Sequence, residues 1–257
     1  MALSILLGAI AIILAVLLID MDQSSSPNPS GKQETSYDNQ GFPEVDWEYW
    51  KSINSDIIGW VTVPGTNIDY PIVQASSADP DYYLHHDIYK NYNVYGVPYL
   101  DASCSTYGLD SANAVVFGHH MNNDTMFSAF ANYSDEAYAK EHSRILLQTP
   151  DWKRVEHVNL VEVIDGTKPS KRTDFIGKAD YDNWYKEQIT NACVTFNTET
   201  TYGVTTFCTC SYNIFNNERT LVLSAPSNYT SPELQPMLDE AEKNLAQRKN
   251  YTWSTSW

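Results

Sequence analysis

Hydrophobic and polar residues alternate in many short segments of the chain, and this pattern predicts a protein built mainly from β-strands. A period of two residues places successive side chains on opposite faces of a strand. Gly, Pro and Asn separate these segments, as turns between strands require. The predicted strands are residues 60–63, 68–73, 95–100, 114–117, 145–149, 155–164, 204–210 and 219–224.

Hydrophobic residues spaced by three and four indicate a smaller number of helices. Trp47, Trp50 and Ile53 follow this spacing and predict a helix. It spans residues 45–58, because Gly59 ends the pattern. Further helices are predicted at residues 126–133, 134–142, 181–193 and 231–249. Many short strands with a few helices favour a mixed barrel or sandwich with helices at its rim.

The first segment of the chain carries no charge before Asp20. Residues 2–19 are almost entirely apolar, and as a helix they would measure about 27 Å, close to the roughly 30 Å of a hydrocarbon core. This run is longer than the apolar part of a cleaved secretory signal, and no small-residue cleavage site follows it. We therefore expect residues 1–20 to be a transmembrane signal-anchor, with a cleaved signal as the alternative.

Composition divides the rest of the chain into three parts. Residues 21–44 are rich in Ser, Pro, Asn and Gln, which predicts a flexible stalk. Residues 45–228 hold the alternating segments and form the predicted globular domain, and residues 229–257 form a predicted helical tail. Every charged residue follows the apolar segment. This order predicts a single-pass protein of the cell membrane with an extracellular domain.

The charge balance narrows the range of partners. The chain has 32 Asp and Glu residues against 16 Lys and Arg, a net charge of −16 at pH 7. Nucleic-acid binding requires clustered positive charge, so no nucleic acid partner is expected. The hydrophobic fraction of 42% supplies enough apolar surface for a packed core, which excludes a chain disordered throughout.

A predicted strand that ends at a glycine presents two histidines. The apolar residues 114–117 lead into Gly118, and His119 and His120 follow directly. Strand ends carry side chains into clefts, where an imidazole can act as an acid or a base near neutral pH. A surface or hydrogen-bonded histidine with no chemical role is the alternative.

Two cysteines lie two positions apart in a later strand. Alternation places Phe207 and Thr209 on one face and Cys208 and Cys210 on the other. The pair lacks the partner ligands of a zinc site, so no metal is expected, and a disulfide between them would be strained. The cysteines are therefore either buried small residues or include a thiol available for reaction.

Arg219 opens the strand that follows this cysteine pair. Antiparallel pairing of residues 204–210 with residues 219–224 would place Arg219 beside Cys210. A guanidinium is always charged and donates several hydrogen bonds, which suits it to stabilise an oxyanion.

Together these three groups resemble the sortases, and class B in particular. Residues 206–210, Thr-Phe-Cys-Thr-Cys, are similar to the family's Thr-Leu-x-Thr-Cys nucleophile motif, with Phe in place of Leu. His119 matches the histidine that follows a strand-end glycine, and Arg219 matches the arginine of the next strand. Residues 54–74 and 82–87 are also similar to class B segments.

The resemblance implies a fold and a set of functional residues. The fold is mixed and mainly β: a sortase-like closed barrel of about eight strands, with N-terminal helices and a helix inserted between strands 6 and 7. Residues 45–228 become the catalytic domain, Cys210 the nucleophile, His119 the acid and base, and Arg219 the oxyanion-stabilising group. The residues implied to bind substrate are Leu84, Cys208, Thr209 and Ser211. No cofactor is implied.

The implied activity is transpeptidation. Cys210 would attack a C-terminal sorting motif of an exported protein, and an amine of the cell-wall precursor or a pilin lysine would resolve the thioacyl-enzyme. The membrane, contacted by the N-terminal helix, completes the expected partners.

Several alternatives remain open in the sequence. His120 is the competing histidine and Cys208 the competing thiol. A cysteine peptidase would use the same catalytic pair with water as the acceptor. Adjacent histidine pairs and the Cys-x-Cys pattern suggest a haem- or metal-binding module, although neighbouring residues do not share one face. A disulfide between Cys104 and Cys193 is also conceivable.

Overall fold

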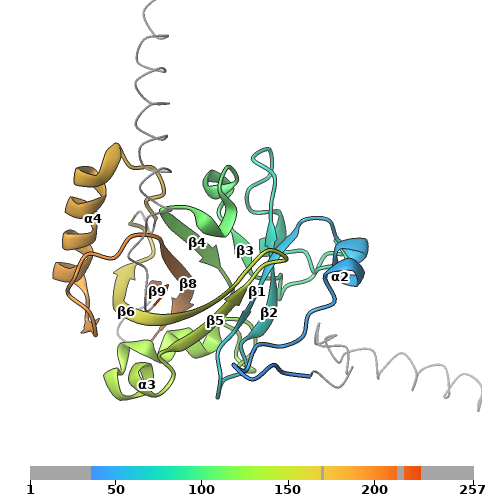
Figure 1. Cartoon of the computed structure of the whole chain (residues 1–257), viewed down its shortest axis with the longest axis horizontal. Helices are drawn as coiled ribbons and strands as arrows, with labels where there is room; N and C mark the ends of the chain where they lie inside the picture. The colour runs from blue at the N-terminus through green and yellow to red at the C-terminus, as the bar shows by residue number, and fades with distance from the viewer. Residues whose placement is uncertain (1–35, 169–170, 213–216, 227–257) are drawn as a thin grey trace, which may run out of the picture. The chain divides into compact units, whose positions relative to one another are not determined.

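The structure, a computed structural model, describes residues 36–168, 171–212 and 217–226 (Figure 1). The described residues all belong to one compact unit. The predicted anchor at residues 1–20, the predicted tail at residues 229–257 and the stalk up to residue 35 lie outside the described residues.

The predicted membrane localisation is contradicted. In the part of the chain that the structure describes, no helix is both long enough and apolar enough to cross a membrane. The longest of these helices, α4 (Gly177–Asn191), carries charged residues along its length. The prediction of a single-pass membrane protein depended on residues 2–19, which are not among the described residues. The predicted localisation at the membrane is therefore wrong, and the described residues give no support for a membrane partner.

One continuous sheet contains the nine strands found among the described residues. They are β1 (Ile57–Thr62), β2 (Asp69–Gln74), β3 (Tyr99–Leu100), β4 (Asn113–Phe117), β5 (Arg144–Gln148), β6 (Lys153–Asp165), β7 (Val194–Thr195), β8 (Val204–Ser211) and β9 (Glu218–Pro226). The strand order is β5-β1-β2-β3-β4-β8-β9-β6-β7, and an additional β5–β6 pairing closes the first eight strands into a ring. The predicted closed, mainly β barrel of about eight strands is confirmed.

Strand β6 contains a β-bulge that changes the direction of its side chains. The register against β9 shifts between Val158 and Leu160. Val158 and Val161 both belong to the cluster inside the barrel, whereas Leu160 packs in the cluster outside it. After the bulge, Leu160, Glu162 and Ile164 therefore share the outer face.

Helices are few, and one of them occupies the predicted insertion. In residues 36–168, 171–212 and 217–226, the α-helices are α2 (Trp47–Ile53), α3 (Glu136–Glu141) and α4. The short 3-10 helices there are η2 (Tyr82–Leu84), η3 (Ala102–Cys104), η4 (Gly108–Asp110) and η5 (Ser128–Ser134). The helix predicted at residues 45–58 ends at Ile53, because Ile57 and Ile58 enter β1. Helix α4 follows β6 and precedes the strand that carries the cysteine pair.

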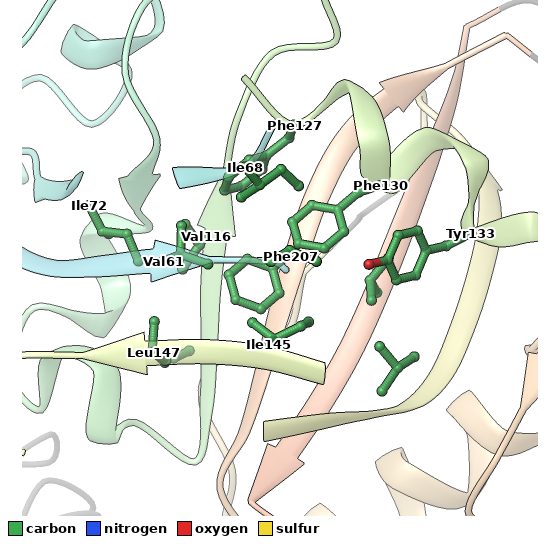
Figure 2. Packing of buried hydrophobic residues seen from close by; sticks show 14 of the residues in the cluster. Val61, Ile68, Ile72, Val116, Phe127, Phe130, Tyr133, Ile145, Leu147 and Phe207 are labelled. Atoms are coloured by element: carbon green, nitrogen blue, oxygen red, sulfur yellow. The ribbon is translucent and has the colours of Figure 1, made fainter. Parts of the chain in front are cut away.

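An aromatic cluster fills the barrel interior (Figure 2). Phe127, Phe130 and Phe207 are fully buried, with ring centroids 5.1, 5.8 and 5.0 Å apart. Aromatic rings at these separations gain stabilisation beyond their buried area. Because Phe207 belongs to β8, the cluster fixes the position of the strand that carries Cys210.

Helix α4 covers part of the outer face of the barrel (Figure 1). Its Tyr181, Trp184 and Tyr185 belong to one buried cluster with residues of β6, β8 and β9. The strand residues in this cluster are Leu160, Val204, Cys208, Leu221, Leu223 and Ala225. This buried cluster, with α4 on top of it, therefore lies beside Cys210 on the outer face of the barrel.

Residues 36–44 pack against the barrel, although the sequence places them in the stalk. Phe42 is only 1% exposed. Gln148 Nε2 donates to the Pro43 carbonyl oxygen at 3.0 Å, and Lys153 Nζ lies 2.8 Å from an Asp38 carboxylate oxygen. The folded domain therefore begins before residue 45.

Candidate active site

Cys210 and Arg219 are register partners on neighbouring strands, as the sequence predicts. Cys210 of β8 lies opposite Arg219 of β9 in the antiparallel ladder. Side chains of paired residues point to the same face of a sheet, about 5 Å apart at their Cβ atoms. Cys210 is a free thiol and is partly exposed. The thiol and the guanidinium therefore share one face near the end of both strands.

The face occupied by Cys210 is the outer one. Phe207 lies in the interior cluster and Cys208 in the cluster under α4, which confirms the predicted alternation. Thr209 and Ser211 are 1% and 0% exposed, and Ser211 Oγ accepts a hydrogen bond from Thr220 Oγ1 at 2.8 Å. Both side chains face the interior, so the expectation that they bind substrate on the outer face does not hold.

Gly118 directs His119 toward the same outer face. A Cβ on Gly118 would lie 2.5 Å from ring atoms of the buried Phe127, which places this position against the interior. By alternation, the next residue points outward. Phe117 of β4 pairs with Cys208 in a parallel register, and Gly118 N donates to the Cys208 carbonyl oxygen at 3.1 Å. Continuing this register by two residues brings His119 beside Cys210.

A backbone carbonyl holds the His119 ring. His119 Nε2 lies 2.8 Å from the carbonyl oxygen of Leu84, at the end of η2. A carbonyl oxygen only accepts, so Nε2 carries the proton, and Nδ1 of the neutral ring is left to accept one. Leu84, predicted as a substrate-binding residue, thus contacts the histidine through its backbone. The sequence could not reveal this partner, because it lies 35 positions away.

His120 has a different contact. Its Nδ1 lies 3.0 Å from the carbonyl oxygen of Cys210, and its ring centroid is 5.8 Å from that of Tyr212. The carbonyl again requires a donor, so Nδ1 carries the proton. His120 thereby holds the backbone at the end of β8, whereas the geometry of Gly118 places His119 on the face of the thiol.

The Arg219 guanidinium lies over the loop that follows β6. Its Nη1 donates to the Glu218 carbonyl oxygen at 3.1 Å and to Asn217 Oδ1 at 3.5 Å. A Cβ on Gly166 would lie 2.8 Å from the same nitrogen. Glycine at this position therefore gives the guanidinium its space.

Cys104 and Cys193 are free thiols. Cys104 Sγ donates to the Asn113 carbonyl oxygen at 3.5 Å, and Cys193 Sγ donates to the Val161 carbonyl oxygen at 3.3 Å. The two thiols do not form the disulfide that the sequence left open. Cys208 is likewise not in a disulfide and is 3% exposed. Among the described residues, no group of three or more His, Cys, Asp or Glu side chains is placed to hold a metal ion.

Comparison with known proteins decides the family. No protein-family model matches the chain. The X-ray structure of Clostridium perfringens sortase B is 30% identical, with a TM-score of 0.62, and the match covers 69% of this chain and 97% of that one. The chain belongs to the sortase family, class B. This confirms the resemblance carried by the cysteine, histidine and arginine motifs.

Two curated sortase B proteins are similar over shorter stretches. Sortase B of Listeria monocytogenes is 39% identical over 93 residues, 36% of each chain. Sortase B of Staphylococcus aureus is 26% identical over 141 residues, 55% of this chain and 57% of that protein. The alignments therefore span less than two thirds of these curated relatives. Sortases are cysteine transpeptidases, enzymes that transfer a peptide acyl group to an amine.

Substitution of Gly118 tests whether its close packing against Phe127 positions His119. We expect Gly118→Ala to force Phe127 and the end of β4 apart, because the new methyl group would overlap the buried ring. The expected result is a loss of about 1–3 kcal/mol in stability and about a tenfold or larger loss in activity. Thermal unfolding and kcat/KM measure the two effects.

A second substitution tests the cause. Phe127→Leu in the Gly118→Ala background should restore part of the activity, because the smaller side chain makes room for the methyl group. Strictly additive losses in the double variant would show that the Gly118 to Phe127 contact does not position His119.

Proposed function

We propose that this sortase uses Cys210 as the nucleophile, His119 as the acid and base, and Arg219 as the oxyanion-stabilising group. The observation that carries the proposal is the register pair Cys210–Arg219 on the outer face, with Gly118 directing His119 to that face. The proposed catalytic domain is residues 45–228, preceded by residues 36–44, which pack against it. Of the remaining segments, residues 21–35 keep the proposed role of a stalk, and residues 229–257 that of a tail.

Acylation begins when the Cys210 thiol attacks a peptide carbonyl. The thiol proton passes to His119, whose Nε2 proton stays bonded to the Leu84 carbonyl oxygen. The new C–S bond produces a tetrahedral oxyanion, which accepts hydrogen bonds from Arg219. When the C–N bond breaks, His119 returns its proton to the leaving amine, and a thioacyl-enzyme remains.

Deacylation reverses the same proton movements with a new amine. His119 takes a proton from the incoming amine as its nitrogen attacks the thioester carbonyl. The C–S bond then breaks, and the Cys210 sulfur recovers a proton from His119. The proposed acyl donor is a C-terminal sorting motif of a protein substrate. The proposed acceptor is an amine of the cell-wall precursor or a pilin lysine.

Partition between an amine and water tests this function. Peptides containing Pro-x-Thr are incubated with the protein, and products are separated by mass with and without an added oligoglycine amine. We expect a thioacyl adduct and a product that shifts from the free acid to the amide as the amine concentration rises. Only free acid at every amine concentration would instead identify a cysteine peptidase.

A further inference from the structure

A cavity of about 810 Å³ lies between α4 and the outer face of β6 and β9. Its lining includes Glu162, Trp184, Gln188, Leu221 and Leu223. On the sheet beneath it, Cys208, Leu221 and Glu162 are register partners across β8, β9 and β6. The next row of partners, two residues along each strand, is Cys210, Arg219 and Ile164. The cavity therefore adjoins the proposed active site on the same face.

Glu162 lines this cavity and carries a buried carboxylate oxygen, Oε1. The residue is 3% exposed, and its Oε1 has no hydrogen-bond donor within the described part of the chain. Burial, together with the nearby Glu187 carboxylate, raises the pKa of Glu162 to about 7. A buried acceptor without a donor is unfavourable and uncommon in folded proteins. A ligand group that donates a hydrogen bond would relieve this cost.

Carboxylate side chains from two elements line the cavity. Glu162 rises from β6, and Glu187 lines the cavity from α4. Asp165, the last residue of β6, and Lys168 of the following loop also line it. Hydrogen bonds from Thr167 and the charge of the exposed Lys168 lower the pKa of Asp165.

The two other cations that line the cavity are paired with carboxylates that do not line it. Lys171 forms an ion pair with Asp101, and Arg172 forms one with Asp180. Neither Asp101 nor Asp180 belongs to the cavity lining. Lys171 and Arg172 thus pair with carboxylates other than Glu162, and Lys168 is exposed in the loop after β6.

We propose that this cavity binds a lysine or arginine side chain of the peptide substrate, with Glu162 as its acceptor. The inference rests on the proposed function, because the peptide must also place its attacked carbonyl at Cys210. A strand spacing of about 4.8 Å and a rise of about 3.3 Å per residue put the Cα atoms of Glu162 and Cys210 about 12 Å apart. An extended peptide covers that distance in about four residues. The basic residue therefore lies within about four residues of the attacked carbonyl.

Proton binding to Glu162 predicts how this preference depends on pH. With a pKa of about 7, the carboxyl is protonated and neutral at pH 5.5, and it is ionised at pH 8. Only the ionised form makes an ion pair with an ammonium group, which is stronger than a hydrogen bond to the neutral carboxyl. Selectivity for a basic residue should therefore be weak at pH 5.5 and strong at pH 8.

The test compares matched peptides that form the thioacyl-enzyme. In each pair, one of the four positions before the attacked carbonyl carries either lysine or norleucine, which has a similar length and no charge. The ratio of the two kcat/KM values is measured on one enzyme, so changes in the catalytic groups cancel. At one position we expect lysine to be favoured about tenfold to a hundredfold at pH 8, and about threefold or less at pH 5.5.

Substitution of Glu162 completes the test. Glu162→Gln should reduce the lysine preference at pH 8 to about threefold or less and remove its pH dependence. Glu136→Gln makes the same chemical change on the exposed first turn of α3 and should leave the ratio unchanged. If Glu162→Gln does not fold, the pH dependence of the ratio in the unaltered protein still decides the question.

The outcomes separate this inference from the proposed function. Equal kcat/KM values for lysine and norleucine at every position and pH would overturn the cation site while leaving transpeptidation intact. A lysine preference that survives Glu162→Gln would assign the selectivity to another residue and also overturn the inference. The absence of any thioacyl adduct with every peptide would overturn the proposed function itself.

Discussion

Replacing Cys210 with alanine is expected to abolish the thioacyl-enzyme and to lower transpeptidation by about 10⁴-fold or more. Cys210 is partly exposed, and it is the register partner of Arg219. Without its sulfur, no covalent intermediate can form at this position. The measurement is the mass of the intact protein after incubation with peptide, followed by the rate of amide product formation.

Cys208→Ala is the matched control for this loss. Cys208 is two residues away on the same strand face, but it is 3% exposed in the cluster under α4. We expect this variant to acylate, with a modest loss of stability because a buried side chain is trimmed. An adduct that survives Cys210→Ala and maps to Cys208 by peptide mass would show that the nucleophile is misassigned.

Arg219→Ala is expected to lower kcat/KM by about a hundredfold to a thousandfold, as the loss of an oxyanion donor does elsewhere. The guanidinium lies in register with the thiol, and its Nη1 is held by the Glu218 carbonyl oxygen and by Asn217. Arg219→Lys keeps the charge but loses the planar fork of donors, so we expect only partial recovery. Steady-state kinetics with one peptide and one amine measure all three proteins.

Arg144→Ala provides the control for a general effect of removing positive charge. Arg144 is on β5, and its guanidinium donates to the Gln40 carbonyl oxygen, so it takes no part in the proposed chemistry. Its activity should stay within about twofold of the unaltered protein. Near-full activity of Arg219→Ala, with unfolding temperatures matched, would remove Arg219 from the mechanism.

The strands and the faces of the cysteine pair could be predicted from the sequence because both depend on local periodicity. Alternation along residues 204–210 predicts that Phe207 and the two cysteines lie on opposite faces. The structure confirms this, with Phe207 in the interior cluster and Cys208 in the outer one. The helix predicted at residues 45–58 was too long, because Ile57 and Ile58 continue its spacing by coincidence. Their place in β1 comes from pairing with β2 and not from the local pattern.

Other parts of the candidate site depend on tertiary contacts that no local pattern contains. The Leu84 carbonyl that holds His119 comes from a 3-10 helix distant in sequence. The resemblance implies that Thr209 and Ser211 bind substrate, although alternation places both on the face opposite Cys210. Glu162 could not be placed from the sequence, because its direction depends on the register shift against β9.

Because of the bulge in β6, the Glu156 carboxylate faces the interior of the barrel and Glu162 lines the cavity on the outer face. Glu156, before the bulge, is fully buried between Thr205 and Ser224, whose hydroxyl groups both donate to it. A strand without the extra residue would keep even-numbered side chains inward and would bury the Glu162 carboxylate in the hydrophobic interior instead. The bulge thus shifts the alternation of side chains in β6 by one residue. As a result, one continuous strand contributes Glu156 to the interior of the barrel before the bulge and Glu162 to the proposed binding cavity after it.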